Sequence, residues 1–350
     1  MEKQIFIGGT GRSGTSVMSK YLGDHKEICQ IPKETKLLVN KGGMIDVYND
    51  LSKHFSLTRG RTAVAMFENL ISDMRNRYTS PYISYDLDQL FGSHELDMAM
   101  QEFITSVTNG SYIAWEIDVK EKLHKIKYLQ RLLYFNFSKL FRLFLNKKTK
   151  VFARYSGNKV LKRITEKNKH HSTIYFQNEE EILYIIRKFV DSLFLSYAKK
   201  RSKAHWCEAT PENIMYADFL AKVYPDAYFI HMVRHPVGVI YSWMQRSWGP
   251  SNIETTCKYL SSGYDRMIYI DKISKIKNIN LSTIKLEDIC NEEKRLDVFS
   301  FLGLSRKNDS NLSLDIEKVN HWKNTISEKD LKLIESYMKK YIEYYNYESV

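Results

Sequence analysis

Short apolar runs alternate with helical patterns along the chain. Residues 5–7 and 228–233 are almost continuously apolar, and a turn follows each of them. Such runs are typical of parallel strands buried on both faces. A helical pattern comes after each run, over 15–23 and from residue 236 onward. We therefore predict an α/β fold of three layers, in which helices flank a central parallel sheet.

The remaining patterns extend this architecture. Residues 29–31 are a further strand candidate, and 205–213 are predicted to be a strand that runs into a turn and a new helix. At 350 residues and 43% hydrophobic content, the chain is large enough for one domain with an insertion. We expect a single domain over 1–350. The other expected elements are helices at 61–78, 94–107 and 179–200, a strand at 112–117 and a polar loop at 157–171.

The charge is concentrated in one segment. The whole chain carries +12, but residues 120–203 contain 22 Lys or Arg against 6 Asp or Glu, a local charge of +16. This favours either a local surface for an anionic partner or lysine-rich solvated helices. We interpret 120–203 as a basic, mostly helical insertion that shapes an acceptor site. Its apolar stretch at 129–145 would cap that site or, as the second choice, lie on an anionic membrane surface.

Several classes of protein are disfavoured. Residues 1–4 lead directly into the first strand, so we expect no secretory signal. We also expect no membrane span, because no apolar run reaches about 18 uncharged residues. The four cysteines lie far apart, which predicts neither a zinc site nor a disulfide framework. These features indicate a cytoplasmic protein, with peripheral membrane contact left open.

The turn after residues 5–7 has the composition of an anion site. Glycines at 8, 9, 11 and 14 let backbone N–H groups and a helix N-terminus point at one anion. The nucleotide-binding pattern G-x-x-x-x-G-K-[ST] fits at Gly9, Gly14 and Ser16, but Thr15 occupies the lysine position. A P-loop kinase or nucleotide hydrolase is therefore a rival, lacking its usual cation. The loop offers the side chains of Arg12, Ser13, Thr15 and Ser16 instead.

A second anion site is predicted after residues 228–233. Arg234 ends this run, and Pro236 suits the first position of the next helix. Ser242 lies six residues into that helix, roughly 9 Å along its axis. Both side chains can therefore reach one phosphate, which a guanidinium can hold with two hydrogen bonds.

Candidate acid–base residues follow the strand at 29–31. Glu34 and Lys36 come just past its carboxyl end. In an α/β sheet this edge lines the ligand crevice, so both residues are expected to face the same opening as the glycine-rich loop.

These motifs resemble those of sulfotransferases that use 3′-phosphoadenosine 5′-phosphosulfate (PAPS). The loop at 9–16 is similar to the family's 5′-phosphosulfate loop, and Arg234 with Ser242 resembles its 3′-phosphate signature. Glu34-Thr35-Lys36 resembles Glu-Thr-Arg of the tyrosylprotein branch, in which the glutamate is the general base. The resemblance covers 4–41 and 205–345. Residues 281–289 and 298–304 resemble a late strand and a helix end of the family, so they are expected to lie in the core. It implies that the nucleotide is held by Gly11, Arg12, Ser13, Gly14, Thr15, Ser16, Arg234, Ser242 and, as a weaker candidate, Lys323.

The sequence departs from the family at one position. Relatives often carry Lys-Thr-Pro where this chain has Ala209-Thr210-Pro211. Lys36 or another cation would then have to neutralise the transferring group. The resemblance accordingly implies Glu34, Arg12 and Lys36 as catalytic residues.

The predicted reaction moves a sulfuryl group from PAPS to an acceptor hydroxyl and leaves 3′-phosphoadenosine 5′-phosphate (PAP). No metal is needed. By analogy with the superfamily, the first choice of acceptor is a carbohydrate. A tyrosine in an acidic peptide is second and a lipid hydroxyl third. Binding of nucleic acid would use the basic segment but leave both anion loops unexplained, so it is not expected.

Overall fold

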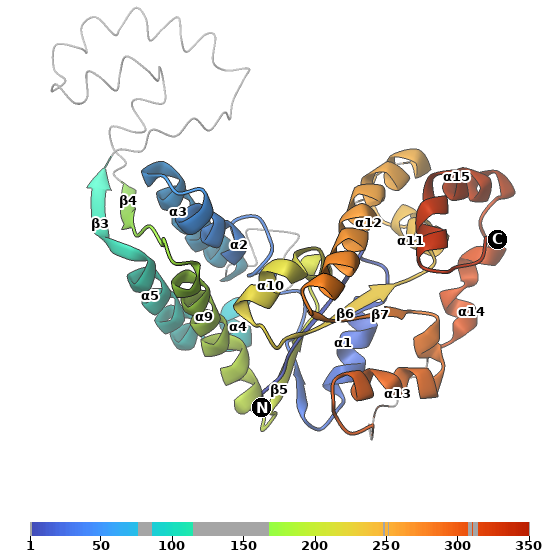
Figure 1. Cartoon of the computed structure of the whole chain (residues 1–350), viewed down its shortest axis with the longest axis horizontal. Helices are drawn as coiled ribbons and strands as arrows, with labels where there is room; N and C mark the ends of the chain where they lie inside the picture. Colours follow the sequence, from blue (N-terminus) through green and yellow to red (C-terminus); the bar gives the residue numbers. More distant parts are fainter. Residues whose placement is uncertain are drawn as a thin grey trace, which may run out of the picture.

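A parallel sheet of five strands forms the centre of the molecule, in the order β2-β5-β1-β6-β7 (Figure 1). The computed structural model describes residues 2–75, 86–114, 168–247, 249–250, 252–306, 310 and 314–349. The predicted fold class, with a parallel sheet between helical layers, is confirmed. The strands are β1 (Gln4–Gly9), β2 (Ile28–Gln30), β5 (His205–Glu208), β6 (Tyr228–Val233) and β7 (Asn280–Lys285).

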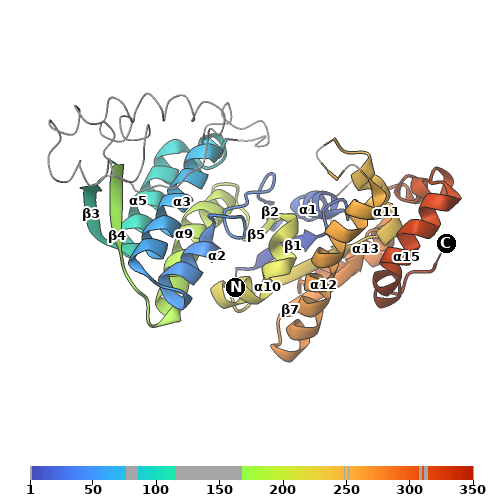
Figure 2. The ribbon, with the colours of Figure 1, turned by 90° about the horizontal axis from the view of Figure 1, so that it is seen from above.

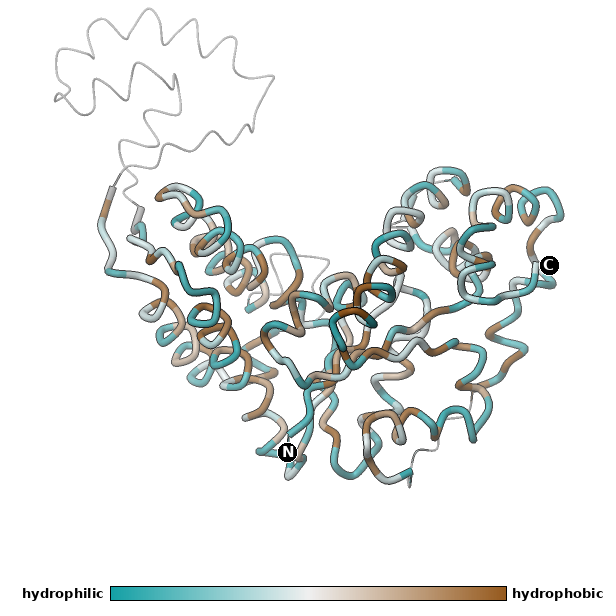
Figure 3. Tube along the Cα trace, viewed as in Figure 1, coloured by the Kyte–Doolittle hydropathy of each residue, from teal (hydrophilic) through white to brown (hydrophobic). Residues whose placement is uncertain are grey.

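The middle strand β1 separates two apolar cores. It pairs with β5 and β6, and Ile5, Phe6 and Ile7 are fully buried. Because side chains alternate along a strand, Ile5 and Ile7 pack on one face and Phe6 on the other. Phe6 stacks on Phe229, with ring centroids 5.5 Å apart. Figure 3 shows the apolar central strands and the more polar helices around them.

Helices cover both faces of the sheet. On one face lie α1 (Thr15–Gly23) and α13 (Glu292–Phe301), and on the other α10 (Ala217–Val223) and α12 (Ile253–Ile276) (Figure 1). Further along, the chain places α11 beside α12 and α15. The bounds of these last elements are α11 (Pro236–Met244), α14 (Ile316–Val319), the 3₁₀ helix η4 (His321–Asn324) and α15 (Glu328–Tyr344).

A helical body packs beside the β2 edge (Figure 2). Phe67, Phe103 and Phe189 join three of its helices, with ring centroids 5.1 to 5.5 Å apart. The body includes segments that precede residue 120, the predicted start of the insertion. Its elements are α2 (Met44–Tyr48), the π-helix η1 (Asn49–Lys53), α3 (Leu57–Arg75), α4 (Leu87–Phe91), α5 (Ser93–Val107) and α9 (Glu179–Lys199).

Several predicted boundaries change in the structure. The strand expected at 112–117 is β3 (Thr108–Ala114), which pairs antiparallel with β4 (Asn168–Thr173). The prediction of a polar loop was therefore wrong for residues 168–171, because β3 gives their backbone a partner. The stretch 129–145 lies outside the described residues.

The prediction of a core at 281–289 holds only in part. β7 is an edge strand, and its residues are partly or fully exposed. Leu286 and Ile289, which follow the strand, are buried, as are Val298 and Leu302.

All the predicted anion and acid–base residues but Lys323 follow carboxyl ends of the central strands. The loop 10–14 follows β1, Glu34 follows β2, and Arg234 follows β6. Glu208 ends β5, and Glu287 comes just after β7. Because parallel strands end at one edge, the sheet gathers these five segments into the crevice where α/β proteins bind ligands.

Candidate active site

The loop after β1 is a tight backbone turn. Gly11, Arg12 and Gly14 all have positive φ, of 70°, 59° and 96°. A Cβ on Gly9 would lie 2.3 Å from the hydroxyl of Ser13 and 2.4 Å from a backbone carbonyl of β6, so only glycine fits there. The Ser13 hydroxyl is fully buried and has no hydrogen-bond partner among the described residues. The loop therefore keeps a buried polar group that an anion can satisfy.

Helix α1 starts directly from this loop without a capping side chain. Its N-cap is Gly14, and its first turn holds no acidic residue. The N-terminal amides of a helix attract anions when no side chain occupies them. Thr15 is buried and Ser16 is exposed at this end. The start of α1 is thus available to a phosphate or phosphosulfate group.

Arg12 and Arg234 lie side by side, although 222 residues separate them. Arg234 Nη1 donates to the Arg12 carbonyl at 3.4 Å, and Arg12 Nε donates to the Ser242 hydroxyl at 3.1 Å. The structure therefore brings both predicted anion sites to the same place. Of the described residues, no carboxylate forms an ion pair with either guanidinium.

A third arginine, Arg246, adds to the positive charge. Burial, followed by the charge of Arg246, lowers the pKa of Arg12. Burial also lowers the pKa of Arg234; the nearby Glu287 carboxylate raises it, and the charge of Arg12 lowers it. Guanidinium groups stay protonated at neutral pH, so three cations repel one another here. Their repulsion favours a bound anion of multiple charge. Arg246 was not predicted, because it follows α11 in a loop without a recognised motif.

The guanidinium of Arg234 and the backbone amide that follows it are both held by hydrogen bonds. Its Nη2 donates to the Val319 carbonyl at 2.6 Å, while its buried Nε has no partner among the described residues. The next amide, of His235, donates to Glu287 at 3.0 Å. Tyr347 donates to the other oxygen of the same carboxylate at 2.8 Å. The guanidinium is thus held beside the loop of Arg12.

Glu34 and Lys36 share the loop after β2. Their charged groups are 3.9 Å apart, from Nζ to Oε2, and both side chains are about two-fifths exposed. Burial raises the pKa of Glu34; Lys36 lowers it, and the carboxylates of Glu212 and Glu208 raise it further. A raised pKa suits a carboxylate that takes up a proton during a reaction.

Ala209 is buried where relatives often carry lysine. Its neighbour Thr210 accepts a hydrogen bond from the backbone N–H of Lys36 at 3.3 Å. The backbone of Lys36 therefore lies next to the segment in which relatives carry that lysine. Lys323 is different. It lies 5.7 Å over the ring of Trp322, and the described residues show no contact from it to the loop of Arg12.

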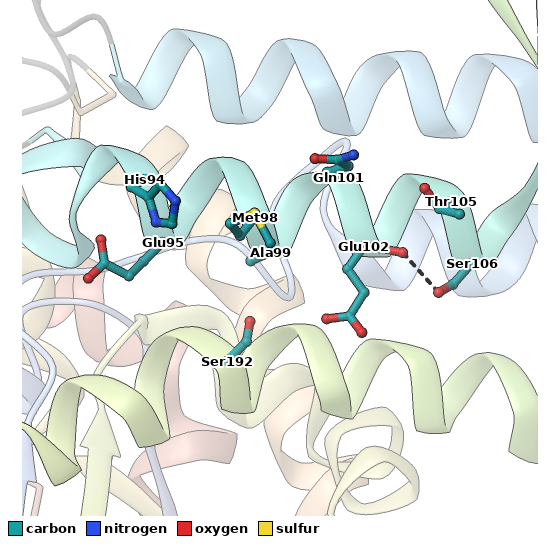
Figure 4. Close-up of a pocket in the computed structure, with 9 residues that line it drawn as sticks. All are labelled: His94, Glu95, Met98, Ala99, Gln101, Glu102, Thr105, Ser106 and Ser192. Atoms are coloured by element: carbon teal, nitrogen blue, oxygen red, sulfur yellow. Dashed lines mark hydrogen bonds between the residues drawn. The ribbon is translucent and has the colours of Figure 1, made fainter.

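A separate groove runs along the helical body. It has a volume of about 770 Å³ and lies between α5 and α9 (Figure 4). Two of its carboxylates already pair with lysines of α9 or its C-terminal cap, Glu95 with Lys200 and Glu102 with Lys188. It holds none of the candidate site residues. The described residues contain no group of three His, Cys, Asp or Glu that could hold a metal ion, and no helix among them is long and apolar enough to span a membrane.

The model of a sulfotransferase family matches residues 132–305. The match includes the site of Arg234 and Ser242, and the independent loop motif at 9–16 lies outside it. The match supports a sulfotransferase family for this chain. No curated protein matches the chain significantly.

Three solved structures of sulfotransferases are similar to the chain. The sulfotransferase domain of the Synechococcus PCC 7002 olefin synthase has 12% identity and a TM-score of 0.41, covering 96% of this chain and 94% of that one. A sulfotransferase from Alicyclobacillus acidocaldarius has 13% identity and a TM-score of 0.35, covering 96% and 95%. Sulfotransferase STF9 from Mycobacterium avium has 10% identity and a TM-score of 0.40, covering 99% and 78%.

Proposed function

We propose that the protein transfers a sulfuryl group from PAPS to an acceptor hydroxyl, with a carbohydrate as the first choice of acceptor. The observation that carries this proposal is the contact of Arg12 with both Arg234 and Ser242, which joins two anion sites at one sheet edge. A nucleotide with phosphate groups at the 3′ and 5′ positions needs two such sites. The loop 11–16 would hold the 5′ end, and Arg234 with Ser242 the 3′-phosphate.

Glu34 would act as the general base. It takes the proton of the acceptor hydroxyl while the acceptor oxygen forms its bond to sulfur. The bond between sulfur and the bridging oxygen breaks, and its electron pair stays on the 5′-phosphate of PAP. Arg12 and the start of α1 stabilise the charge that develops there. Lys36 would stand in for the lysine that Ala209 replaces.

The donor is argued from the two anion sites, whereas the acceptor is argued by analogy with the superfamily. Sulfotransferases of this superfamily accept many carbohydrates, which makes a glycan hydroxyl the first class to test. Tyrosine in an acidic peptide is the alternative, supported by the sequence Glu34-Thr35-Lys36 and the basic segment 120–203. The decisive assay is a mass-spectrometric search for a gain of SO₃ in glycan and peptide mixtures incubated with PAPS.

A thermal-shift experiment separates this function from that of a P-loop kinase. PAP at about 100 times its Kd should raise Tm by about 4 °C, because selective binding to the folded state adds about 2.7 kcal/mol. ATP with magnesium at the same concentration should give a smaller shift, since it lacks the 3′-phosphate. A larger shift with ATP and magnesium would contradict the proposed donor.

The pH dependence of turnover should report the pKa of Glu34. Its raised pKa means that the base becomes protonated at a higher pH than an ordinary glutamate. The acidic limb of kcat/KM should therefore lie above the ordinary value of about 4.3. The test is to measure rates at saturating PAPS from about pH 4 to 8, an interval that spans this value. An acidic limb at or below the ordinary value would contradict the assignment of Glu34.

A further inference from the structure

The carboxylate of Glu208, at the carboxyl end of β5, accepts more hydrogen bonds than the other described carboxylates there. It belongs to none of the motifs above and has no role in the proposed function. Glu208 ends β5 and is 1% exposed. Five donor groups contact its two oxygens. They are Thr35 N at 3.0 Å, Thr35 Oγ1 at 3.1 Å, Thr210 Oγ1 at 2.6 Å, Thr210 N at 3.2 Å and Asn213 Nδ2 at 2.5 Å.

These bonds join the two loops that carry the candidate chemistry. Thr35 stands between Glu34 and Lys36, so Glu208 holds the middle of the loop after β2. The hydroxyl of Thr210 donates to Glu208 and accepts from the amide of Lys36. One buried carboxylate therefore holds the two peptide groups that follow Glu34, directly at the amide of Thr35 and through Thr210 at the amide of Lys36.

The loop needs such an anchor because its backbone is strained. Lys33 and Lys36 have positive φ, of 65° and 58°, although neither is glycine. Conformations of this kind are strained for residues with a Cβ and persist only where other contacts hold them. The bonds to Glu208 are the buried contacts that the described structure offers for this purpose.

We propose that Glu208 is a positioning residue, which fixes the loop 33–36 so that Glu34 and Lys36 face the bound donor. The inference rests on the proposed function for its catalytic meaning. Glu208 touches no reacting atom. It acts through Thr35 and Thr210, and its negative charge adds to the field around Glu34.

Glu208→Gln is the main test, because glutamine keeps the shape but replaces one acceptor oxygen with an NH₂ group. In the full chain it should lower kcat about 30-fold, as expected for a misplaced base, while the Kd for PAP stays within about threefold. Thr35→Val should lower kcat in the same direction, and Thr35→Ser should restore most of it. The matched control is Asp271→Asn, which removes a buried carboxylate that pairs with His231. If kcat per folded molecule falls no further in Glu208→Gln than in this control, or if PAP affinity falls equally, the proposal is wrong.

Two measurements on the free protein decide the point without turnover. Amide hydrogen exchange at Thr35 and Lys36 should be faster in Glu208→Gln than in wild type or Asp271→Asn. Carbon-13 NMR should show a lower pKa of Glu34, identified by comparison with Glu34→Gln, because a neighbouring negative charge is removed. Unchanged exchange and an unchanged pKa would overturn the positioning role. A wild-type protein that does not turn over PAPS with any glycan or peptide mixture would instead refute the proposed function, and the exchange data would still decide whether Glu208 anchors the loop.

Discussion

Glu34→Gln should lower kcat by about three powers of ten, because general-base catalysis contributes about 10² to 10⁴-fold. The variant keeps the shape of the side chain but removes its capacity to accept a proton, together with the charge that pairs with Lys36. The Kd for PAP should therefore stay within about threefold of the wild-type value. The measurement is the rate of PAP release from PAPS in the glycan mixture, with PAP binding followed by calorimetry.

Glu212→Gln is the matched control for this experiment. Glu212 is an exposed carboxylate whose charge raises the pKa of Glu34. Its replacement should leave kcat nearly unchanged and move the acidic limb slightly downward. If both variants lose activity alike, the loss comes from the local field and Glu34 is not the base. If Glu34→Gln retains turnover close to that of wild type, the base is another group.

The sequence predicted the elements whose signals are local. Helix α1 begins and ends at the predicted residues, because a glycine-rich turn sets its start and Gly23 ends the pattern. The fully buried strands β1 and β6 were likewise visible as apolar runs. Because both strands are parallel, Arg12 and Arg234 were expected at the same carboxyl end of the sheet. Their direct contact, however, depends on the strand register and could only be seen in three dimensions.

The sequence did not predict features that depend on long-range pairing. Glu208 looked like a polar residue at the end of a strand, and only its burial against Thr35, 173 residues away, gives it a role. The strand at 168–173 lacked a local signal because its partner β3 supplies the hydrogen bonds. β7 was expected in the core because it resembles a strand of the family, but it lies at an edge with one side unpaired. Tertiary context decided each of these cases.

Arg234→Ala should weaken PAP binding about 100-fold, because hydrogen bonds to charged groups contribute about 1.5–3 kcal/mol each and Arg234 can offer more than one. Calorimetry with adenosine 5′-phosphate provides an internal control, since this nucleotide lacks the 3′-phosphate. Its affinity should change less than about threefold, because the 5′ end contacts the loop after β1 instead. The difference between the two nucleotides isolates the contact with the 3′-phosphate.

Arg187→Ala is the matched control for the loss of an arginine that donates to backbone. Arg187 lies in α9 and donates to the Val223 carbonyl at 2.6 Å, much as Arg234 donates to that of Val319. Its replacement should lower Tm without changing the affinity for either nucleotide. Equal weakening of PAP and adenosine 5′-phosphate in Arg234→Ala would mean that this side chain only supports the fold of the loop. The 3′-phosphate would then have to be held by the Ser242 hydroxyl, which Arg12 already contacts, and by the charges of Arg12 and Arg246, which act on each other.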